Sequence, residues 1–228
     1  MMKFTPILLA LVYGLVVWRF SAWRLKAQLD QRSAELAEPG LRQLTARLAA
    51  ALDLPRIRVH LYDIPAINGL AAPDGRIFLT RGFLDAYRAG RVTAEELASV
   101  IAHELGHVAL GHSRRRMIDF SGQNALRVGL AAVLGRFLPG LGPMLANAAM
   151  SLLAARLSRG DEYEADAYAA ALLTKAGIGT GPQISLLQKL KHLTGAAGAG
   201  RPAWLMSHPK TDARVAAIQR LDARWTGA

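Results

Sequence analysis

The sequence contains no cysteine. Disulfide bonds, thiolate metal sites and cysteine nucleophiles are therefore excluded, and the redox compartment of the protein is left undetermined. Any metal ion bound by this chain has to be held by histidine and carboxylate side chains.

Acidic residues are also scarce, since 17 Asp and Glu stand against 28 Lys and Arg and give a formal net charge of +11. Such an excess favours anionic partners. The sequence has no nucleic-acid-binding motif and no stripe of aromatic residues interleaved with basic ones. We therefore expect membrane lipids as partners and no nucleic acid.

Long hydrophobic runs are lacking as well. The N-terminal run, Phe4 to Trp18, has fifteen residues without a charge, whereas a bilayer span needs about 17 to 25. Snorkelling of the flanking Lys3 and Arg19 extends its reach. A cleaved signal peptide and a buried helix are the alternatives, but no small-x-small cleavage site follows the run, so we predict an uncleaved membrane anchor.

Helical and strand patterns alternate over the first half of the chain. The pattern is helical from residue 21 to about 52, is broken at Glu38-Pro39-Gly40, and gives a first domain helix over 41–52. Strands are expected over 57–62, 66–72 and 76–80, and the turn signal Pro73-Asp74-Gly75 makes the last two a hairpin. A short helix is expected from Arg81 to near Gly90.

The first arm of this hairpin has small side chains that leave its backbone accessible. An edge of this kind can accept an extended peptide as an added strand. We expect it to bind substrate, although an ordinary edge strand is the alternative. The residues concerned are Asn68, Gly69, Leu70 and Ala71.

The helix expected from Thr93 to Gly111 carries the most informative motif, His103-Glu104-Leu105-Gly106-His107. Residues four apart project from one helix face, about 6 Å from each other, so His103 and His107 can bind one zinc ion. Glu104 flanks the pair, as does the general base of a zinc peptidase. Thr93 and Glu96 fit a capping box at the start of the helix.

A second helix, expected from Ser158 to a stop at Gly177, supplies the third ligand. Glu162 and Asp166 share a face, so Glu162 can bind the metal while Asp166 holds the ring N–H of a ligating histidine. Asp161 and Glu164 are expected to face solvent. The rival pattern, H-E-x-x-H-x-x-G-x-x-H, fails because its last histidine would fall at Ser113.

The stretch between these helices is apolar over 128–134 and 137–155, and Pro139, Gly140, Gly142 and Pro143 interrupt it. We expect a hydrophobic helical hairpin over or beside the active site. A second membrane segment is the alternative.

These residues resemble the family of membrane-associated zinc metallopeptidases, the gluzincins, that includes HtpX, the CAAX prenyl proteases, BepA and the Oma-type proteases. The resemblance covers about residues 41–221. Its markers are Asn68, Arg81-Gly82, the 103–107 motif with His112, Ser158-Arg159, Glu162 to Asp166, and Ser207-His208-Pro209 with Arg214.

The resemblance implies a zincin fold, one zinc ion bound by His103, His107 and Glu162, and Glu104 as the general base. It places His208 near the site as an oxyanion stabiliser or a gating residue, and a helix-capping histidine is the alternative. HtpX and the prenyl proteases have several transmembrane helices, so the one clear candidate segment of this chain favours a BepA- or Oma-like domain on an anchor.

The predicted fold class is therefore α+β and predominantly helical, with a small β-hairpin or sheet beside the 103–107 helix. Residues 1–20 form an anchor or signal segment, 21–40 a juxtamembrane helix, and 41–228 the zinc metallopeptidase domain.

The predicted function is zinc-dependent endopeptidase activity at a membrane, in protein quality control, on misfolded or membrane-associated polypeptides. A non-catalytic zinc-stabilised adaptor or chaperone is the alternative, although it leaves Glu104 without a role.

The charges that flank the apolar run predict its orientation. Only Lys3 precedes the run, whereas four basic residues follow it closely: Arg19, Arg24, Lys26 and Arg32. Because positive charge stays on the cytoplasmic side, we expect the catalytic domain in the cytoplasm, at a bacterial inner membrane. A periplasmic domain is the alternative.

Overall fold

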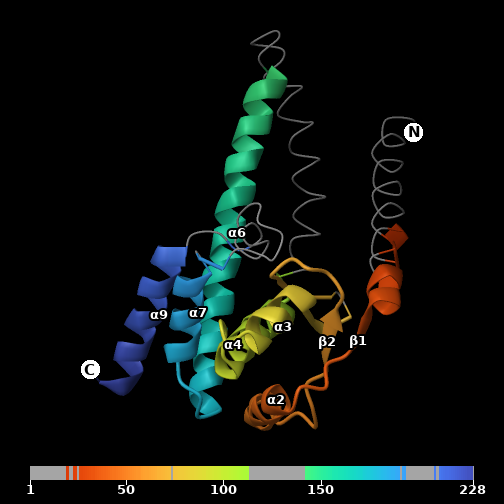
Figure 1. Cartoon of the computed structure of the whole chain (residues 1–228). Helices are drawn as coiled ribbons and strands as arrows, with labels where there is room; N and C mark the ends of the chain where they lie inside the picture. Colours follow the sequence, from red (N-terminus) through yellow and green to blue (C-terminus); the bar gives the residue numbers. More distant parts are fainter. Residues whose placement is uncertain are drawn as a thin grey trace.

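The computed structural model of the chain describes residues 19–20, 23–24, 26–72, 74–112, 142–190, 192–193, 208 and 211–227, and for 142–143, 145–157 and 211 it describes the backbone alone. These residues form a predominantly helical domain with one small mixed sheet (Figure 1), which confirms the predicted class at this level.

The sheet has four strands in the order β1-β2-β4-β3. Strand β1 (Ser33–Glu35) is antiparallel to β2 (Val59–Tyr62), which is parallel to β4 (Ile77–Thr80). Strand β3 (Gly69–Ala71) is antiparallel to β4, with Gly69 opposite Leu79. The predicted hairpin is thus confirmed, and β3 forms one edge of the sheet.

One helix, α4 (Ala94–Ala109), lies at the centre of the domain and contacts helices on one side and the sheet on the other (Figure 1). The helices packed around it are α2 (Pro39–Ala51), α3 (Arg81–Arg88), α6 (Gly142–Lys175) and α7 (Gly181–Lys189), while α9 (Thr211–Thr226) packs against α6 and α7. Because α4 is covered from all these directions, most of its residues are buried.

Successive side chains of β4 point to opposite faces of the sheet, and both faces are apolar. Ile77 and Leu79 belong to the main core around α4, whereas Phe78 points to the opposite face and packs with Leu29 and Tyr62. Leu29 comes from the helical segment 26–32, which therefore covers the second face.

The start of α4 follows the predicted capping box. The Glu96 N–H donates to Thr93 Oγ1 at 3.2 Å, and the Thr93 N–H donates to Glu96 Oε2 at 2.9 Å. These bonds satisfy two of the amide groups that a helix N-terminus leaves without partners. Beyond the other end, Gly111 has a φ of 67°, a left-handed conformation that glycine adopts at low cost and that turns the chain away from the helix axis.

Two predictions of helix boundaries are wrong. The helix expected to run from residue 21 towards Glu38 gives way to β1, because backbone pairing with β2 overrides the favourable helix propensity of Ala34 and Glu35. The helix expected to begin at Ser158 already begins at Gly142 and runs on as one helix of 34 residues, whose first half extends away from the rest of the described domain (Figure 1).

The membrane predictions concern parts of the chain that are mostly outside the described residues. The apolar run at 4–18 lies outside them, and so does the apolar stretch up to residue 141. Within the described residues, no helix is both long enough and apolar enough to cross a membrane.

Candidate metal centre

The two histidines of the 103–107 motif meet as their spacing predicts. His103 Nε2 and His107 Nε2 lie 3.1 Å apart on one face of α4, and both side chains are buried. Two nitrogen ligands are thus directed at one point inside the domain.

A carboxylate from α6 completes the cluster. Glu162 Oε2 lies 3.5 Å from His103 Nε2, and Glu162 Oε1 lies 3.5 Å from His107 Nε2. Together with His208, these residues place four possible ligand atoms within 4.8 Å of one another, all on buried side chains. The structure therefore brings together the three predicted metal ligands from two helices.

Glycine at position 106 explains why the two helices approach so closely. A Cβ atom at Gly106 would lie 3.1 Å from the Cα and carbonyl oxygen of Ala165. A side chain there would push α6 away from α4, and Ala165 adds only a methyl group on the facing side. The close approach lets the short glutamate side chain reach both histidines.

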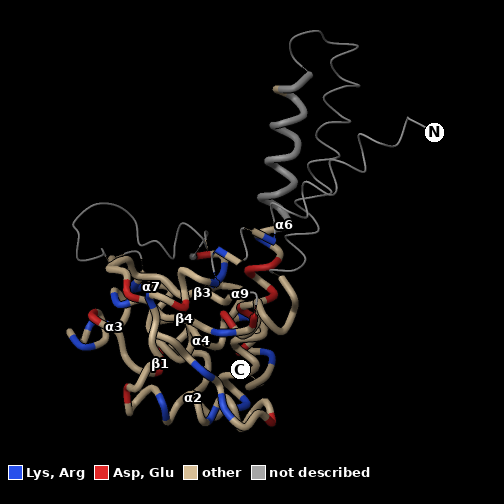
Figure 2. Tube along the Cα trace, turned by 90° about the vertical axis from the view of Figure 1, so that its right-hand side faces the viewer, with Lys and Arg blue, Asp and Glu red and all other residues tan. Residues whose placement is uncertain are grey.

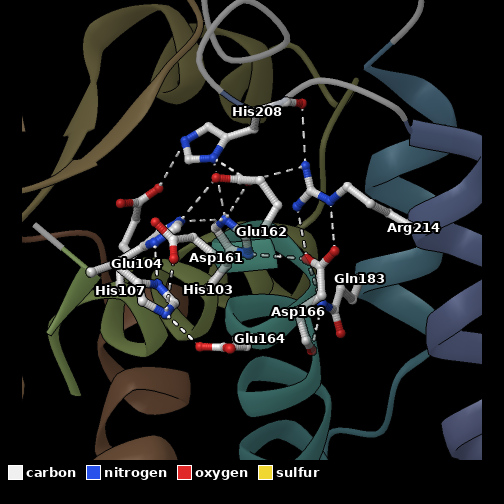
Figure 3. A network of polar contacts seen from close by, with 11 residues as sticks. His103, Glu104, His107, Asp161, Glu162, Glu164, Asp166, Gln183, His208 and Arg214 are labelled. Atoms are coloured by element: carbon white, nitrogen blue, oxygen red, sulfur yellow. Dashed lines mark hydrogen bonds and ion pairs between the residues drawn. The ribbon is translucent and has the colours of Figure 1, made fainter. Parts of the chain in front are cut away.

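Asp166 contacts the outer nitrogen of His103, as the sequence predicts. His103 Nδ1 lies 3.0 Å from Asp166 Oδ1. Arg214, from α9, holds the same carboxylate in a bidentate contact, with Nε donating to Oδ2 at 2.6 Å and Nη2 donating to Oδ1 at 2.7 Å. Gln183 of α7 donates to the backbone carbonyl of Asp166 at 3.2 Å and to its Oδ1 at 3.4 Å. Side chains from α4, α7 and α9 thus contact this one carboxylate (Figure 3).

These contacts favour a positive charge at the centre. Burial by itself lowers the pKa of His103, but hydrogen bonds with Asp166 and Glu162 raise that pKa to about 9. Burial opposes ionisation of Asp166, yet Arg214 and His103 lower its pKa to about 2. The pKa of Glu162 is likewise lowered, against its burial, by His103 and His208. The ionised Glu162 carboxylate beside imidazole nitrogens is a donor set suited to a divalent cation, and Asp166 supports it from the outer nitrogen of His103.

Glu104 and His208 are buried beside the cluster, where Figure 3 shows them facing each other. His208 Nδ1 donates to Glu162 Oε2 at 2.6 Å, and His208 Nε2 lies 3.6 Å from Glu104 Oε1. That oxygen of Glu104 is buried and has no hydrogen-bond partner among the described residues. Arg214 Nη1 donates to the His208 carbonyl at 3.2 Å and so ties this residue to the rest of the site.

Of the two acidic residues near Glu162 that were predicted to face solvent, one is exposed and the other is buried. Glu164 is exposed, as expected, but Asp161 is buried, so its predicted exposure is wrong. Figure 2 shows acidic positions of α6 where this helix joins the body of the domain. Asp161 Oδ1 comes within 3.9 Å of Nε2 of His112, which is also buried and contacts His107.

The predicted substrate strand lies beside Glu104. A Cβ atom at Gly69 would come within 2.6 Å of Val100 Cγ1 and 3.6 Å of Glu104 Oε1, so only glycine lets β3 pack this closely on α4. Asn68 is anchored to β4 because its N–H donates to Thr80 Oγ1 at 2.9 Å. Leu70 and Ala71 are half-buried at the edge of the sheet.

Arg214 and Gln183 were not predicted to support the site, although the sequence carries a signal for both. Arg214 shares a helix face with the buried Ile218, four residues later, and Gln183 shares one with Leu186 and Leu187. A polar residue within an apolar helical stripe indicates a buried polar contact, because an unpaired group there would be costly.

A structural metal site is closed by four protein ligands, whereas a catalytic one leaves a position open and keeps a base nearby. Here four buried side chains offer possible ligand atoms, and a buried carboxylate oxygen of Glu104 without a hydrogen-bond partner among the described residues lies beside them, an arrangement that fits a metallopeptidase. Residues 35–222 match peptidase family M48, and the chain belongs to this family. The family resemblance seen in the sequence is thereby confirmed.

Relatives named as proteases support the same class. The chain is 32% identical to Metalloprotease LoiP of Escherichia coli, over 60% of this chain and 52% of LoiP. It is 26% identical to Protease HtpX of Alkalilimnicola ehrlichii, over 90% of this chain and 78% of HtpX. It is 27% identical to human mitochondrial Metalloendopeptidase OMA1, over 72% of this chain and 32% of OMA1. The chain thus spans about half the length of LoiP and a third of OMA1.

Proposed function

We propose that this chain is a zinc-dependent endopeptidase of the gluzincin type, with zinc bound by His103, His107 and Glu162 and with Glu104 as the general base. The observation that carries the proposal is Glu104 Oε1, a buried carboxylate oxygen next to the ligand cluster without a hydrogen-bond donor among the described residues. Burying such an oxygen is costly unless a water molecule donates to it. A general base in a hydrolytic site needs that contact with water.

The donor set supports zinc with an open coordination position. Two imidazoles and one carboxylate are the protein ligands of one common kind of catalytic zinc site. His208 uses Nδ1 for its hydrogen bond to Glu162, and its other nitrogen is directed at Glu104. His208 therefore acts as a hydrogen-bond donor beside the site, which leaves three protein ligands.

Each residue has a separate task in the proposed reaction. A zinc ion held by His103, His107 and Glu162 would supply Lewis acidity that lowers the pKa of water and polarises the scissile carbonyl group. Glu104 accepts the proton of the attacking water and delivers it to the leaving amine. His208, as an imidazolium that keeps its Nδ1 hydrogen bond to Glu162, donates its Nε2 hydrogen to the oxyanion that develops on the substrate. Asp166, held by Arg214, keeps His103 in the tautomer that offers Nε2 to the metal.

Strand β3 is proposed to bind the substrate as an added strand. It is the edge strand of the sheet, and Gly69 brings its backbone against the helix that carries Glu104. An extended peptide paired with residues 68–71 would pass beside the catalytic carboxylate. Backbone pairing gives affinity without strict sequence preference, which suits a protease acting on misfolded polypeptides.

The proposal for the whole chain includes a membrane anchor at 1–20, a juxtamembrane segment at 21–40 and the peptidase domain at 41–228. It rests on the apolar run at 4–18 and on the basic residues that follow it. The expected location is the cytoplasmic face of a bacterial inner membrane, in contact with anionic lipids. Reporters fused after Ala228 test the orientation: a fluorescent cytoplasmic reporter supports it, and active alkaline phosphatase at the same position contradicts it.

Replacing Glu104 by glutamine tests the chemistry. The variant should bind one zinc ion per chain and hydrolyse casein about 10²- to 10⁴-fold more slowly, because the amide cannot accept the proton. Glu95→Gln is the matched control, since Glu95 lies on the same helix but is exposed. Near-normal hydrolysis by Glu104→Gln would refute the assigned base, and zinc binding without any hydrolysis by the wild type would favour the adaptor role.

A further inference from the structure

The outer nitrogen of His107 contacts a second histidine instead of a carboxylate. His107 Nδ1 lies 2.8 Å from His112 Nδ1, and His112 is fully buried. On a continuing helix, a residue five positions after His107 would point about 140° away from it. The left-handed turn at Gly111 ends the helix and lets His112 fold back beneath His107.

Only one arrangement of hydrogens is compatible with metal binding at His107 Nε2. That nitrogen must offer a lone pair, so a neutral His107 carries its hydrogen on Nδ1. At 2.8 Å, His112 Nδ1 must then be the acceptor, which leaves the hydrogen of His112 on Nε2. The contact therefore specifies the tautomers of both rings.

The hydrogen on His112 Nε2 has its acceptor on α6. His112 Nε2 lies 3.1 Å from Glu164 Oε2 and 3.9 Å from Asp161 Oδ1. Figure 3 shows Asp161 and Glu164 on the helix that also carries Glu162. The acceptor at the end of the chain of contacts is thus an exposed carboxylate, Glu164, with the buried Asp161 nearby.

We propose that His112 is a positioning residue of the metal centre: it accepts the hydrogen of His107 Nδ1, donates its own Nε2 hydrogen to Glu164, and thereby holds His107 with Nε2 directed at the metal. The two ligand histidines are then supported differently, His103 by a carboxylate directly and His107 through a second imidazole. The inference rests on the proposed function only in requiring a metal ion at His103, His107 and Glu162.

A second metal site is the alternative role for His112, Asp161 and Glu164. These three side chains place possible ligand atoms within 4.8 Å of one another. Zinc at His112 Nε2 would require the His112 hydrogen on Nδ1. His107 would then carry its hydrogen on Nε2 and lose its lone pair for the catalytic metal. The tautomers therefore favour the positioning role over two simultaneous metal ions.

The test measures zinc affinity by competition with a chromophoric chelator, in the full chain. His112→Ala removes the acceptor, and we expect zinc to bind about 10- to 100-fold more weakly. His112→Asn keeps an acceptor, because Asn Oδ1 occupies nearly the place of His Nδ1, and should recover most of the affinity. Glu164→Ala should keep one zinc per chain with a smaller loss. His192→Ala is the matched control, since His192 is exposed.

Nitrogen NMR of the zinc-loaded wild type provides a readout that a purely structural role would not move. We expect hydrogens on His107 Nδ1 and on His112 Nε2. The opposite tautomers, or wild-type affinity in His112→Ala, or equal weakening in His112→Ala and His112→Asn, would overturn the inference. Two zinc ions in the wild type, with the second lost in Glu164→Ala, would replace it by the second metal site.

The two proposals fail in distinguishable ways. If the wild type binds no zinc, the proposed function is refuted and the inference with it. If the wild type binds one zinc and His112→Ala binds it equally well, only the role of His112 is refuted.

Discussion

Replacing Arg214 by methionine tests how the outer support of the metal centre contributes to stability. Its guanidinium is 1% exposed, donates twice to Asp166 at 2.6 and 2.7 Å, and lies 3.5 Å from Glu162 Oε2. Methionine fills much of the volume without charge, so the substitution leaves buried Asp166 without its cation. Removing one partner of a buried pair costs about 3–5 kcal/mol, because the remaining charge stays desolvated.

Arg81→Met is a matched control that differs mainly in burial. Arg81 Nε contacts Asp63 Oδ1 at the same distance of 2.6 Å, but the two side chains are 46% and 67% exposed. An exposed pair of this kind contributes about 0.2–1 kcal/mol, because water solvates both partners when the contact is broken. Replacing the buried arginine should therefore lower the free energy of unfolding several times more than replacing the exposed one, although their contact distances are equal.

Urea unfolding followed by circular dichroism measures both costs, with a chelator present so that metal binding does not contribute. A cost of 3–5 kcal/mol is a large part of the roughly 5–15 kcal/mol that stabilises a typical domain. If Arg214→Met does not fold, Arg214→Lys keeps the charge but loses the bidentate contact and should give an intermediate cost. A cost below about 1 kcal/mol for Arg214→Met, or equal costs for the two arginines, would refute the reasoning.

Three further predictions follow from single contacts. Burial opposes ionisation of Glu96, but hydrogen bonds, first among them the one from Lys189, hold its pKa below the ordinary 4.5. The contribution of the ionised Glu96 to the stability of the fold is therefore complete above pH 4.5 and is lost as the pH falls through the lowered pKa. Glu96→Gln should remove this part of the acid dependence of unfolding. Gly69→Ala should destabilise the domain by about 1–3 kcal/mol, since its Cβ would lie 2.6 Å from Val100 Cγ1, and adding Val100→Ala should recover part of this; a fully tolerated Gly69→Ala would contradict the packing. Chelation should lower the melting temperature, and added zinc should restore it. At a zinc concentration 1,000 times the Kd, binding should raise the free energy of unfolding by about 4 kcal/mol. An unchanged melting temperature would argue against a metal in the native fold.

Relations within one helix were predictable from the sequence alone. The spacing of His103 and His107, the capping box at Thr93, and the shared face of Glu162 and Asp166 all follow from the 3.6-residue repeat. The hairpin of β3 and β4 was predictable for a similar reason, because a short turn fixes the pairing of the strands beside it. The clustering of His103, His107 and Glu162 and the outer partner of His103 could therefore be predicted before the fold was known.

Contacts between distant segments were decided only by the tertiary structure. Pairing with β2 turned a helical pattern into β1, and the packing of α9 on α6 brought Arg214 onto Asp166. The turn at Gly111 placed His112 beneath His107, which also buried Asp161 against expectation. Local sequence determines which side chains share a helix face, but the hydrogen bonds of a buried polar group depend on which other elements pack against that face, and this is a property of the whole fold.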